Sequence, residues 1–223
     1  LVIIPGLLIA RQPDLGTSLL VIAAGLIVVF LSGIPFRYIF SLIILCIPSS
    51  LLLWKFMKDY QRQRVLTLIN PDTDPLGAGY NIIQSKIAMG SGGIFGKGWT
   101  NGSQVQLEFL PEKNTDFIFA VVGEEFGLLG VLTILTLYIL IIGRGLYIAS
   151  NASDLYGRLL AGSISLTFFV YVFVNTAMVI GLMPIVGIPL PLISYGGTSM
   201  VTLMIGFGML MSINSNRKLV AKK

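Results

Sequence analysis

Apolar runs of roughly the length that spans a bilayer make up most of this chain. An α-helix needs about 20 apolar residues to cross about 30 Å of hydrocarbon. Five runs are near or above that length, apart from the slightly short first pair: residues 17–32, 36–54, 116–142, 156–183 and 191–213. Residues 1–10 are the end of a further span, kinked or ended near Pro5. The sequence therefore predicts an all-α polytopic membrane protein.

The composition supports this fold class and excludes several kinds of site. Of the 223 residues, 55% are apolar and 11% are charged. The single cysteine, Cys46, lies in an apolar run, so we predict no disulfide framework and no zinc site. The absence of histidine removes the commonest proton carrier. We attribute the net charge of +5 to orientation in a membrane and not to nucleic-acid binding.

The chain is organised as a single membrane domain over residues 1–223 with one long polar loop. It starts with leucine inside an apolar segment, without the charged n-region or cleavage site of a signal peptide. We therefore expect a fragment that begins partway through a helix. The loop covers residues 55–115 and joins the spans at 36–54 and 116–142.

The distribution of basic residues predicts the orientation of these spans. Seven lysines and arginines lie in short loops or the tail on one side: Arg37, Arg144, Arg158, Arg217, Lys218, Lys222 and Lys223. The opposite short connections contain only Arg11. The positive-inside rule therefore makes the C-terminus cytoplasmic and places the 55–115 loop on the periplasmic or extracellular face, because loops of its length are largely exempt from the rule.

Two stretches of the 55–115 loop have patterns of their own. Apolar residues at 82, 83, 87 and 88 have helical spacing, which predicts an amphipathic segment at the membrane interface. The stretch 90–99, GSGGIFGKGW, lacks the glycine and the serine or threonine that a nucleotide-binding phosphate loop requires. It is therefore either a flexible turn or an anion site, in which backbone amides and Lys97 hold an anionic head group.

The stretch 184–197, PIVGIPLPLISYGG, places three prolines and three glycines between two spans. Such a sequence breaks a helix, and broken backbone at membrane depth usually lines a cavity. Ser194 and Tyr195 then become candidate wall residues, whereas an ordinary external hairpin is the alternative. Asn175, polar at mid-span, is best explained as hydrogen-bonding glue between helices.

Carboxylates are concentrated where they are most expensive. Four of the ten in the chain fall within residues 110–130, at the start of an apolar run: Glu112, Asp116, Glu124 and Glu125. Asp116 falls in the first turn of the predicted helix, and on a straight helix at most one of the two later glutamates shares its face. A carboxylate at that depth normally faces a cavity or a cationic partner. We expect a functional role, with a structural salt bridge as the alternative.

The chemistry that such a carboxylate permits is base catalysis on the external face. Beside a cavity it can take the proton of a sugar hydroxyl as that hydroxyl attacks an anomeric carbon. The helix N-terminus lowers its pKa and desolvation raises it, and the sequence leaves that balance open.

Four stretches together closely resemble the SEDS (shape, elongation, division, sporulation) family of peptidoglycan glycosyltransferases, across essentially the whole chain. They are QPDLGTSLL, YQRQRVLTLINPDTDPLGAGYNIIQSKIAMGSGGIFGKGW, LEFLPEKNTDFIFAVVGEEFGLLG and PIVGIPLPLISYGGTSM. DYQRQR, DPLGAGY and IAMGSGG are similar to the RodA, or elongation, type. The resemblance implies a fold of ten helices around an external cavity, of which this chain has the truncated fifth to the tenth. It makes Asp116 the essential carboxylate of the PExHTDF motif, whose usual histidine is Asn114 here.

The resemblance also implies a reaction and its partners. Two lipid II-derived substrates would be joined by a β-1,4 bond with loss of undecaprenyl diphosphate, and Asp116 would deprotonate the acceptor. Lys97, Lys113, Arg62 or a divalent cation (Mg or Mn) would neutralise the leaving diphosphate. Glu112, Glu124 and Glu125 would position groups around the cavity. No metal site of the protein itself is predicted, and a class B penicillin-binding protein would be the partner in the bacterial inner membrane.

Two alternatives stay open at this point. Intramembrane carboxylates and broken helices are equally expected of a lipid II flippase or another transporter. The second alternative is that the chain is an inactive truncated copy. The reason is that, in the family, the missing first half supplies cationic residues and helices of the cavity.

Overall fold

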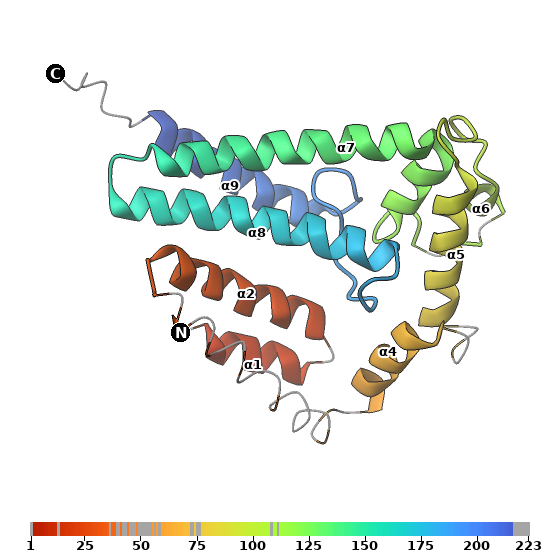
Figure 1. The fold of residues 1–223 in the computed structure, drawn as a ribbon, viewed down its shortest axis with the longest axis horizontal. Coiled ribbons are helices and arrows are strands. Elements are labelled where there is room, and N and C mark those ends of the chain that lie inside the picture. The colour runs from red at the N-terminus through yellow and green to blue at the C-terminus, as the bar shows by residue number, and fades with distance from the viewer. Residues whose placement is uncertain are drawn as a thin grey trace.

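The computed structural model is all-helical over the part of the chain that it describes (Figure 1). It describes residues 2–12, 14–35, 59–71, 77–107, 109–110 and 112–215, with isolated residues between 37 and 74. The helices are α1 (Ile3–Arg11), α2 (Leu15–Leu31), α4 (Asp59–Ile69), α5 (Ala78–Ser91), α6 (Ser103–Gln106), α7 (Ile118–Ser150), α8 (Leu155–Val179) and α9 (Gly197–Ser215). No strand occurs among these residues, so the predicted fold class is confirmed.

Three helices, α7, α8 and α9, are long and apolar enough to cross a membrane. Their outward surfaces carry exposed leucine and isoleucine side chains, such as Ile139 and Leu140 on α7 and Ile205 on α9. This is the pattern of helices that face lipid. The chain is therefore a multi-pass membrane protein. The shorter apolar helix at residues 16–31 matches the run predicted there, whereas most of the predicted span at 36–54 and the basic tail lie outside the described residues.

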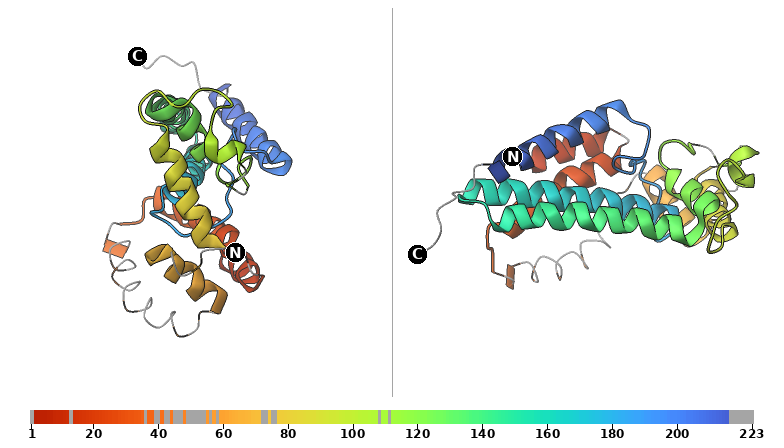
Figure 2. Two further views of the ribbon diagram at one scale, coloured as in Figure 1. Left: turned by 90° about the vertical axis from the view of Figure 1, so that its right-hand side faces the viewer. Right: turned by 90° about the horizontal axis from the view of Figure 1, so that it is seen from above.

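Helices α7 and α8 form an antiparallel pair, and α9 packs against both (Figure 2). The tight connection between α7 and α8 ends at Asp154, whose carboxylate accepts a hydrogen bond from the Gly157 amide and caps α8. One aromatic residue from each helix closes the core: the rings of Tyr138 and Phe168 are 5.8 Å apart, and those of Phe168 and Phe207 are 5.6 Å apart. Helices α1 and α2 form a second pair, and α2 packs against α8.

Helices α5 and α6 of the predicted external loop lie at one end of the α7–α8 pair, opposite the turn that joins the two helices, whereas α4 lies beyond α5 (Figure 1). Helix α5 bears out the helical spacing predicted at 82–88. Its residues Ile82 and Ala88 are fully buried, and Ser85 donates a hydrogen bond to the Val179 carbonyl at the end of α8. Ile87 is exposed. The buried face of α5 therefore packs against the rest of the protein at this end of the α7–α8 pair.

Candidate active site

A hollow of about 780 Å³ opens just before the start of α7. Its lining comes from the turn that precedes α7 and from the proline-rich connection between α8 and α9: Leu110, Glu112, Lys113, Asn114, Thr115, Asp116 and Tyr195. The tertiary structure thus brings together four of the residues singled out from the sequence: Glu112, Lys113, Asp116 and Tyr195. Carboxylate, ammonium, amide and phenol groups around one opening suit the recognition of a polar substrate.

Asp116 is the most enclosed charged group of this hollow, with 8% of the residue exposed. It lies in the turn before α7 and not in the helix itself, so the prediction that at most one of the later glutamates shares its helix face does not apply. Its carboxylate oxygen Oδ2 lies against the backbone of Gly187, 3.5 Å from the position that a Cβ would take there. The side chain is therefore held between the turn and the α8–α9 connection.

The surroundings of Asp116 settle the balance that the sequence leaves open. Burial is the largest of the effects that raise the pKa of its carboxyl group from 3.8 to about 6, and the nearby carboxylate of Glu112 adds to it through charge repulsion and a hydrogen bond. Glu112 itself has a φ of +54°, an uncommon conformation for a residue with a side chain. A carboxylate with a pKa near 6 is ionised at neutral pH and is a stronger base than an ordinary aspartate.

The connection between α8 and α9 braces the turn that carries Asp116. Ser194, predicted as a wall residue, uses its hydroxyl for the backbone: it donates to the Thr115 carbonyl and accepts from the Leu190 amide. Tyr195 is 82% exposed at the rim of the hollow. Asn175, predicted as glue between helices, contacts the Asp116 carbonyl directly, a link that its sequence position did not reveal.

A second polar cluster forms around Glu124, which is completely buried. The Lys97 ammonium is 2.7 Å from Glu124 Oε1 and 2.8 Å from the Ser103 hydroxyl. The backbone amide of Gln104 and the Ser103 hydroxyl also donate to Glu124 Oε1. The predicted cationic partner of an inner glutamate is thus Lys97. Neither Glu124 nor Glu125 lines the hollow of Asp116, and their assignment to substrate stays a prediction.

The glycine-rich stretch 92–98 fits into a break in α7. At Gly127 the backbone has φ +64° and ψ −159°, so the helical hydrogen bonds are interrupted. Four backbone hydrogen bonds of 2.9–3.1 Å join loop and break: Lys97 N to Glu124 O, Gly98 N to Glu125 O, Leu128 N to Gly93 O, and Leu129 N to Ile94 O. The loop amides at 97 and 98 are thus used by the helix, while the choice between a flexible turn and an anion site stays a prediction.

The remaining candidate cations differ in their distance from Asp116. Lys113 lines the same hollow, and its ammonium donates to the Val105 carbonyl at 2.9 Å. Arg62 lies on α4, where it donates to the Lys55 carbonyl. No group of three potential metal ligands occurs among the described residues. The divalent cation stays a prediction, and diphosphate oxygens could supply most of its ligands.

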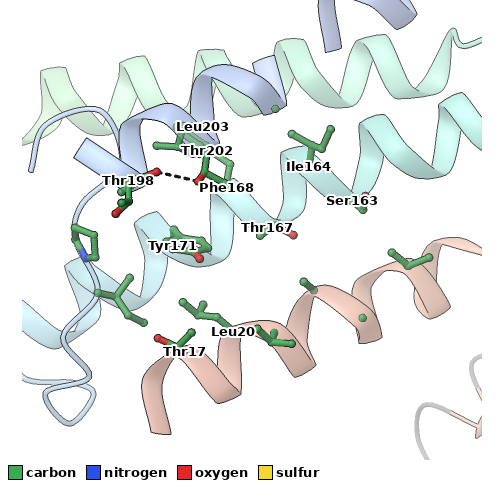
Figure 3. Close-up of a pocket in the computed structure, with 18 of the residues that line it drawn as sticks. Thr17, Leu20, Ser163, Ile164, Thr167, Phe168, Tyr171, Thr198, Thr202 and Leu203 are labelled. Atoms are coloured by element: carbon green, nitrogen blue, oxygen red, sulfur yellow. Dashed lines mark hydrogen bonds between the residues drawn. The ribbon is translucent and has the colours of Figure 1, made fainter. Parts of the chain in front are cut away.

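A larger apolar cavity of about 820 Å³ lies between α2, α8 and α9 (Figure 3). Leu20 of α2, Phe168 and Tyr171 of α8 and Leu203 of α9 line it. Residues 187–189 of the α8–α9 connection also line it, and a Cβ at Gly187 would lie 3.5 Å from Asp116 Oδ2. This cavity was not predictable from the sequence, because its walls come from apolar runs that look alike.

Comparison with known proteins identifies the family. A family model described as the cell cycle protein family of FtsW, RodA and SpoVE matches residues 1–219. The chain belongs to the FtsW/RodA/SpoVE family. The resemblance stated from the sequence motifs is thereby confirmed. Peptidoglycan glycosyltransferase MrdB of Escherichia coli (strain K12) is 58% identical over all 223 residues, and peptidoglycan glycosyltransferase RodA of Treponema pallidum is 45% identical over 180 residues.

Solved structures agree with this membership. A chain of a peptidoglycan synthase complex that coordinates polymerization and crosslinking is 36% identical, with a TM-score of 0.76 over 94% of this chain and 58% of that one. The rod shape determining protein RodA of Thermus thermophilus is 28% identical, with a TM-score of 0.58 over 94% of this chain and 52% of that one. The chain spans 60% of the length of the Escherichia coli relative and 42% of the Treponema pallidum one.

Proposed function

We propose that this chain is the catalytic part of an enzyme that polymerises lipid II into glycan strands during cell elongation and rod-shape maintenance. The names of the relatives, all peptidoglycan glycosyltransferases, support the class of reaction. The observation that carries the proposal is Asp116, an enclosed carboxylate with a pKa of about 6 at the wall of a polar hollow. A base of that strength is ionised at neutral pH and can still accept a proton in the transition state.

In this reaction the 4-hydroxyl of the GlcNAc of one lipid II attacks C1 of the MurNAc of another lipid-linked chain. The new bond joins that oxygen to C1 as the bond from C1 to the diphosphate breaks, so the configuration inverts to a β-1,4 link. Asp116 accepts the proton of the hydroxyl, and undecaprenyl diphosphate leaves with the electron pair of the broken bond. Glu112 keeps the pKa of Asp116 high, and Tyr195 offers an exposed ring at the rim.

The leaving diphosphate develops negative charge that positive groups stabilise. Lys113 is a cation that lines the hollow, so we assign it the main role in stabilising the charge of the leaving diphosphate. A divalent cation bound mainly by the diphosphate oxygens would serve the same purpose. Lys97 is engaged by Glu124, and Arg62 lies on another helix, so both are assigned weaker roles.

The proposed setting is the bacterial cytoplasmic membrane, with the hollow on the external side and the C-terminus in the cytoplasm. The distribution of lysine and arginine between the short loops supports this orientation. The likeness to a chain of a peptidoglycan synthase complex supports a class B penicillin-binding protein as partner, which would supply transpeptidation.

Polymerisation of labelled lipid II by the full-length protein with its penicillin-binding partner tests this proposal. Three forms are compared: native, Asp116→Asn, and Asp59→Asn. Asp59 is an exposed carboxylate at the start of α4 and serves as the control. We expect glycan strands from the native protein and from Asp59→Asn, and none from Asp116→Asn.

A parallel assay of lipid II movement across reconstituted vesicles separates the enzyme from a transporter. Lipid II transport by the native protein without any polymerisation would replace the proposal with the flippase. Polymerisation by Asp116→Asn at the native rate would remove Asp116 as the base while leaving the enzyme class in place.

A further inference from the structure

Three consecutive carbonyl groups lead into α7, and each accepts a hydrogen bond from a part of the chain that is distant in sequence. The Tyr195 amide donates to the Asn114 carbonyl, the Ser194 hydroxyl to the Thr115 carbonyl, and the Asn175 amide to the Asp116 carbonyl. The donors come from α8 and from the α8–α9 connection. The backbone that carries the Asp116 side chain is therefore held at three successive residues by α8 and the α8–α9 connection.

Asn175 makes the link closest to the carboxylate. Its side-chain nitrogen donates to the Asp116 carbonyl at 2.9 Å and to the Ile188 carbonyl at 2.7 Å. Ile188 follows Gly187, where an added Cβ would lie 3.5 Å from Oδ2 of the Asp116 carboxylate. One side chain of α8 thus ties together the two backbone segments between which the carboxylate lies.

The energetic cost of burying Asn175 indicates that its two hydrogen bonds have a role in the structure. Asn175 is completely buried, and its side-chain oxygen has no hydrogen-bond partner. A buried acceptor without a partner is unfavourable because it has lost its water. An apolar side chain of similar size, such as leucine, would avoid that loss but could not join the two carbonyls. The two carbonyl partners also fix the orientation of the amide.

Ser194 braces the neighbouring position in both directions. Its hydroxyl donates to the Thr115 carbonyl and accepts from the Leu190 amide at 2.7 Å. The hydroxyl is used on both sides by backbone groups, so its contribution to the site is geometric. Tyr138 of α7 also donates to the Pro191 carbonyl, which adds a further link to the α8–α9 connection at this point.

We propose that Asn175 and Ser194 are positioning residues, which set the place of the Asp116 carboxylate by holding the carbonyls of Asp116 and Thr115. This inference rests on the proposed function. A general base must lie within hydrogen-bond reach of the proton that it removes, and a misplacement of about 1 Å costs about 100-fold in rate. Neither side chain lines the hollow, so their effect on the reaction passes through Asp116.

The test uses the full-length protein with its penicillin-binding partner and labelled lipid II. Asn175→Leu keeps the branched shape of the side chain and removes both N–H donors, and Ser194→Ala removes the hydroxyl with little change in size. Ser165→Ala is the matched control, because Ser165 is a buried hydroxyl of α8 that bonds within its own helix, to the Ala161 carbonyl.

We expect kcat to fall about 100-fold in Asn175→Leu and about 10-fold in Ser194→Ala, with KM for lipid II changed less than about threefold. The acidic midpoint of the rate–pH profile should move to lower pH in both variants, because a loosened carboxylate is better hydrated. Ser165→Ala should keep the native kcat and midpoint. A purely structural role would lower the amount of folded protein and leave the midpoint of the remaining activity unchanged.

Two results would overturn the inference. One is an Asn175→Leu protein with kcat within about threefold of native. The other is a loss of activity, in either variant, that follows the folded fraction with an unshifted midpoint. Ser194→Ala decides between these outcomes if Asn175→Leu does not fold. If the native protein polymerises lipid II and Asp116→Asn does not, the proposed function stands even when the inference about Asn175 and Ser194 fails. An inactive native protein would instead remove the proposed function itself.

Discussion

The ion pair between Lys97 and Glu124 holds the glycine-rich loop against the break in α7, and its removal should loosen this end of the protein. Lys97→Met keeps most of the apolar stem and deletes the charge. It leaves Glu124 fully buried with hydrogen bonds only from the Ser103 hydroxyl and the Gln104 amide, both to Oε1. The second oxygen of Glu124 has no partner even in the intact protein.

The expected magnitude follows from the burial of the two partners. Breaking a buried ion pair by removing one charge costs about 3–5 kcal/mol. The Lys97 side chain is 29% exposed, so water can partly replace the ammonium, and we expect the lower end, about 3 kcal/mol. The double variant Lys97→Met/Glu124→Gln removes both charges and keeps an acceptor for the Gln104 amide, so it should cost only about 1.5 kcal/mol.

Equilibrium unfolding in detergent measures these free energies. Trp99 is a local fluorescence probe, because it lies on the same loop with its ring 5.6 Å from that of Phe126 on α7. Lys86→Met, at an exposed lysine of α5, is the matched control and should be near neutral. A Lys97→Met protein as stable as native, or a double variant destabilised as much as the single one, would show that the ion pair does not stabilise the loop.

Three further predictions concern the site and the helix break. Asp116→Asn should raise the free energy of unfolding at pH 7.5 by up to about 3 kcal/mol, since a pKa raised from 3.8 to about 6 makes the ionised native form costly. That cost grows as pH rises from about 4 to 6, so denaturation at pH 4 should show no gain. Glu112→Gln removes the neighbouring charge and should shift the acidic midpoint of the rate–pH profile below that of the native protein; an unshifted midpoint would exclude the charge effect. Gly127→Ala should destabilise by at least about 2 kcal/mol, because φ is +64° and a Cβ would lie 2.3 Å from the Gly96 nitrogen. Gly143→Ala, on the same helix with nothing within 4 Å, should instead stabilise by about 0.5–1 kcal/mol, and both values come from the same unfolding assay.

The spans were largely predictable because apolar length is a local property of the sequence. The run predicted from residue 116 to 142 is a helix from Ile118 to Ser150. Its extension past 142 includes Arg144, which ends the apolar run without ending the helix, since arginine is a good helix former. The last span begins at Gly197 and not at 191, because the prolines at 189 and 191 keep the preceding backbone extended or turned.

The sequence singled out four of the residues that line the hollow, Glu112, Lys113, Asp116 and Tyr195, but not the contacts that hold the site together. Asp116 stands out because a carboxylate next to an apolar run is costly, and that signal lies within a few positions. The partners of the other groups are far away in sequence: Lys97 meets Glu124, and Asn175 meets the Asp116 carbonyl 59 residues away. The break at Gly127 could not be predicted either, because glycine also occurs at regular helical positions such as Gly143.

The proposed reaction depends above all on the Asp116 carboxylate as the base of the glycosyl transfer. The measurement that tests this role is the rate of lipid II polymerisation between about pH 4.5 and 8 by the full-length protein with its partner, native and Asp116→Asn. We predict that the native rate rises with pH through a midpoint near 6 and then levels off, as the carboxylate becomes ionised, while folded Asp116→Asn makes no glycan at any pH. Glycan synthesis by Asp116→Asn with the same pH profile as the native protein would contradict this role of Asp116.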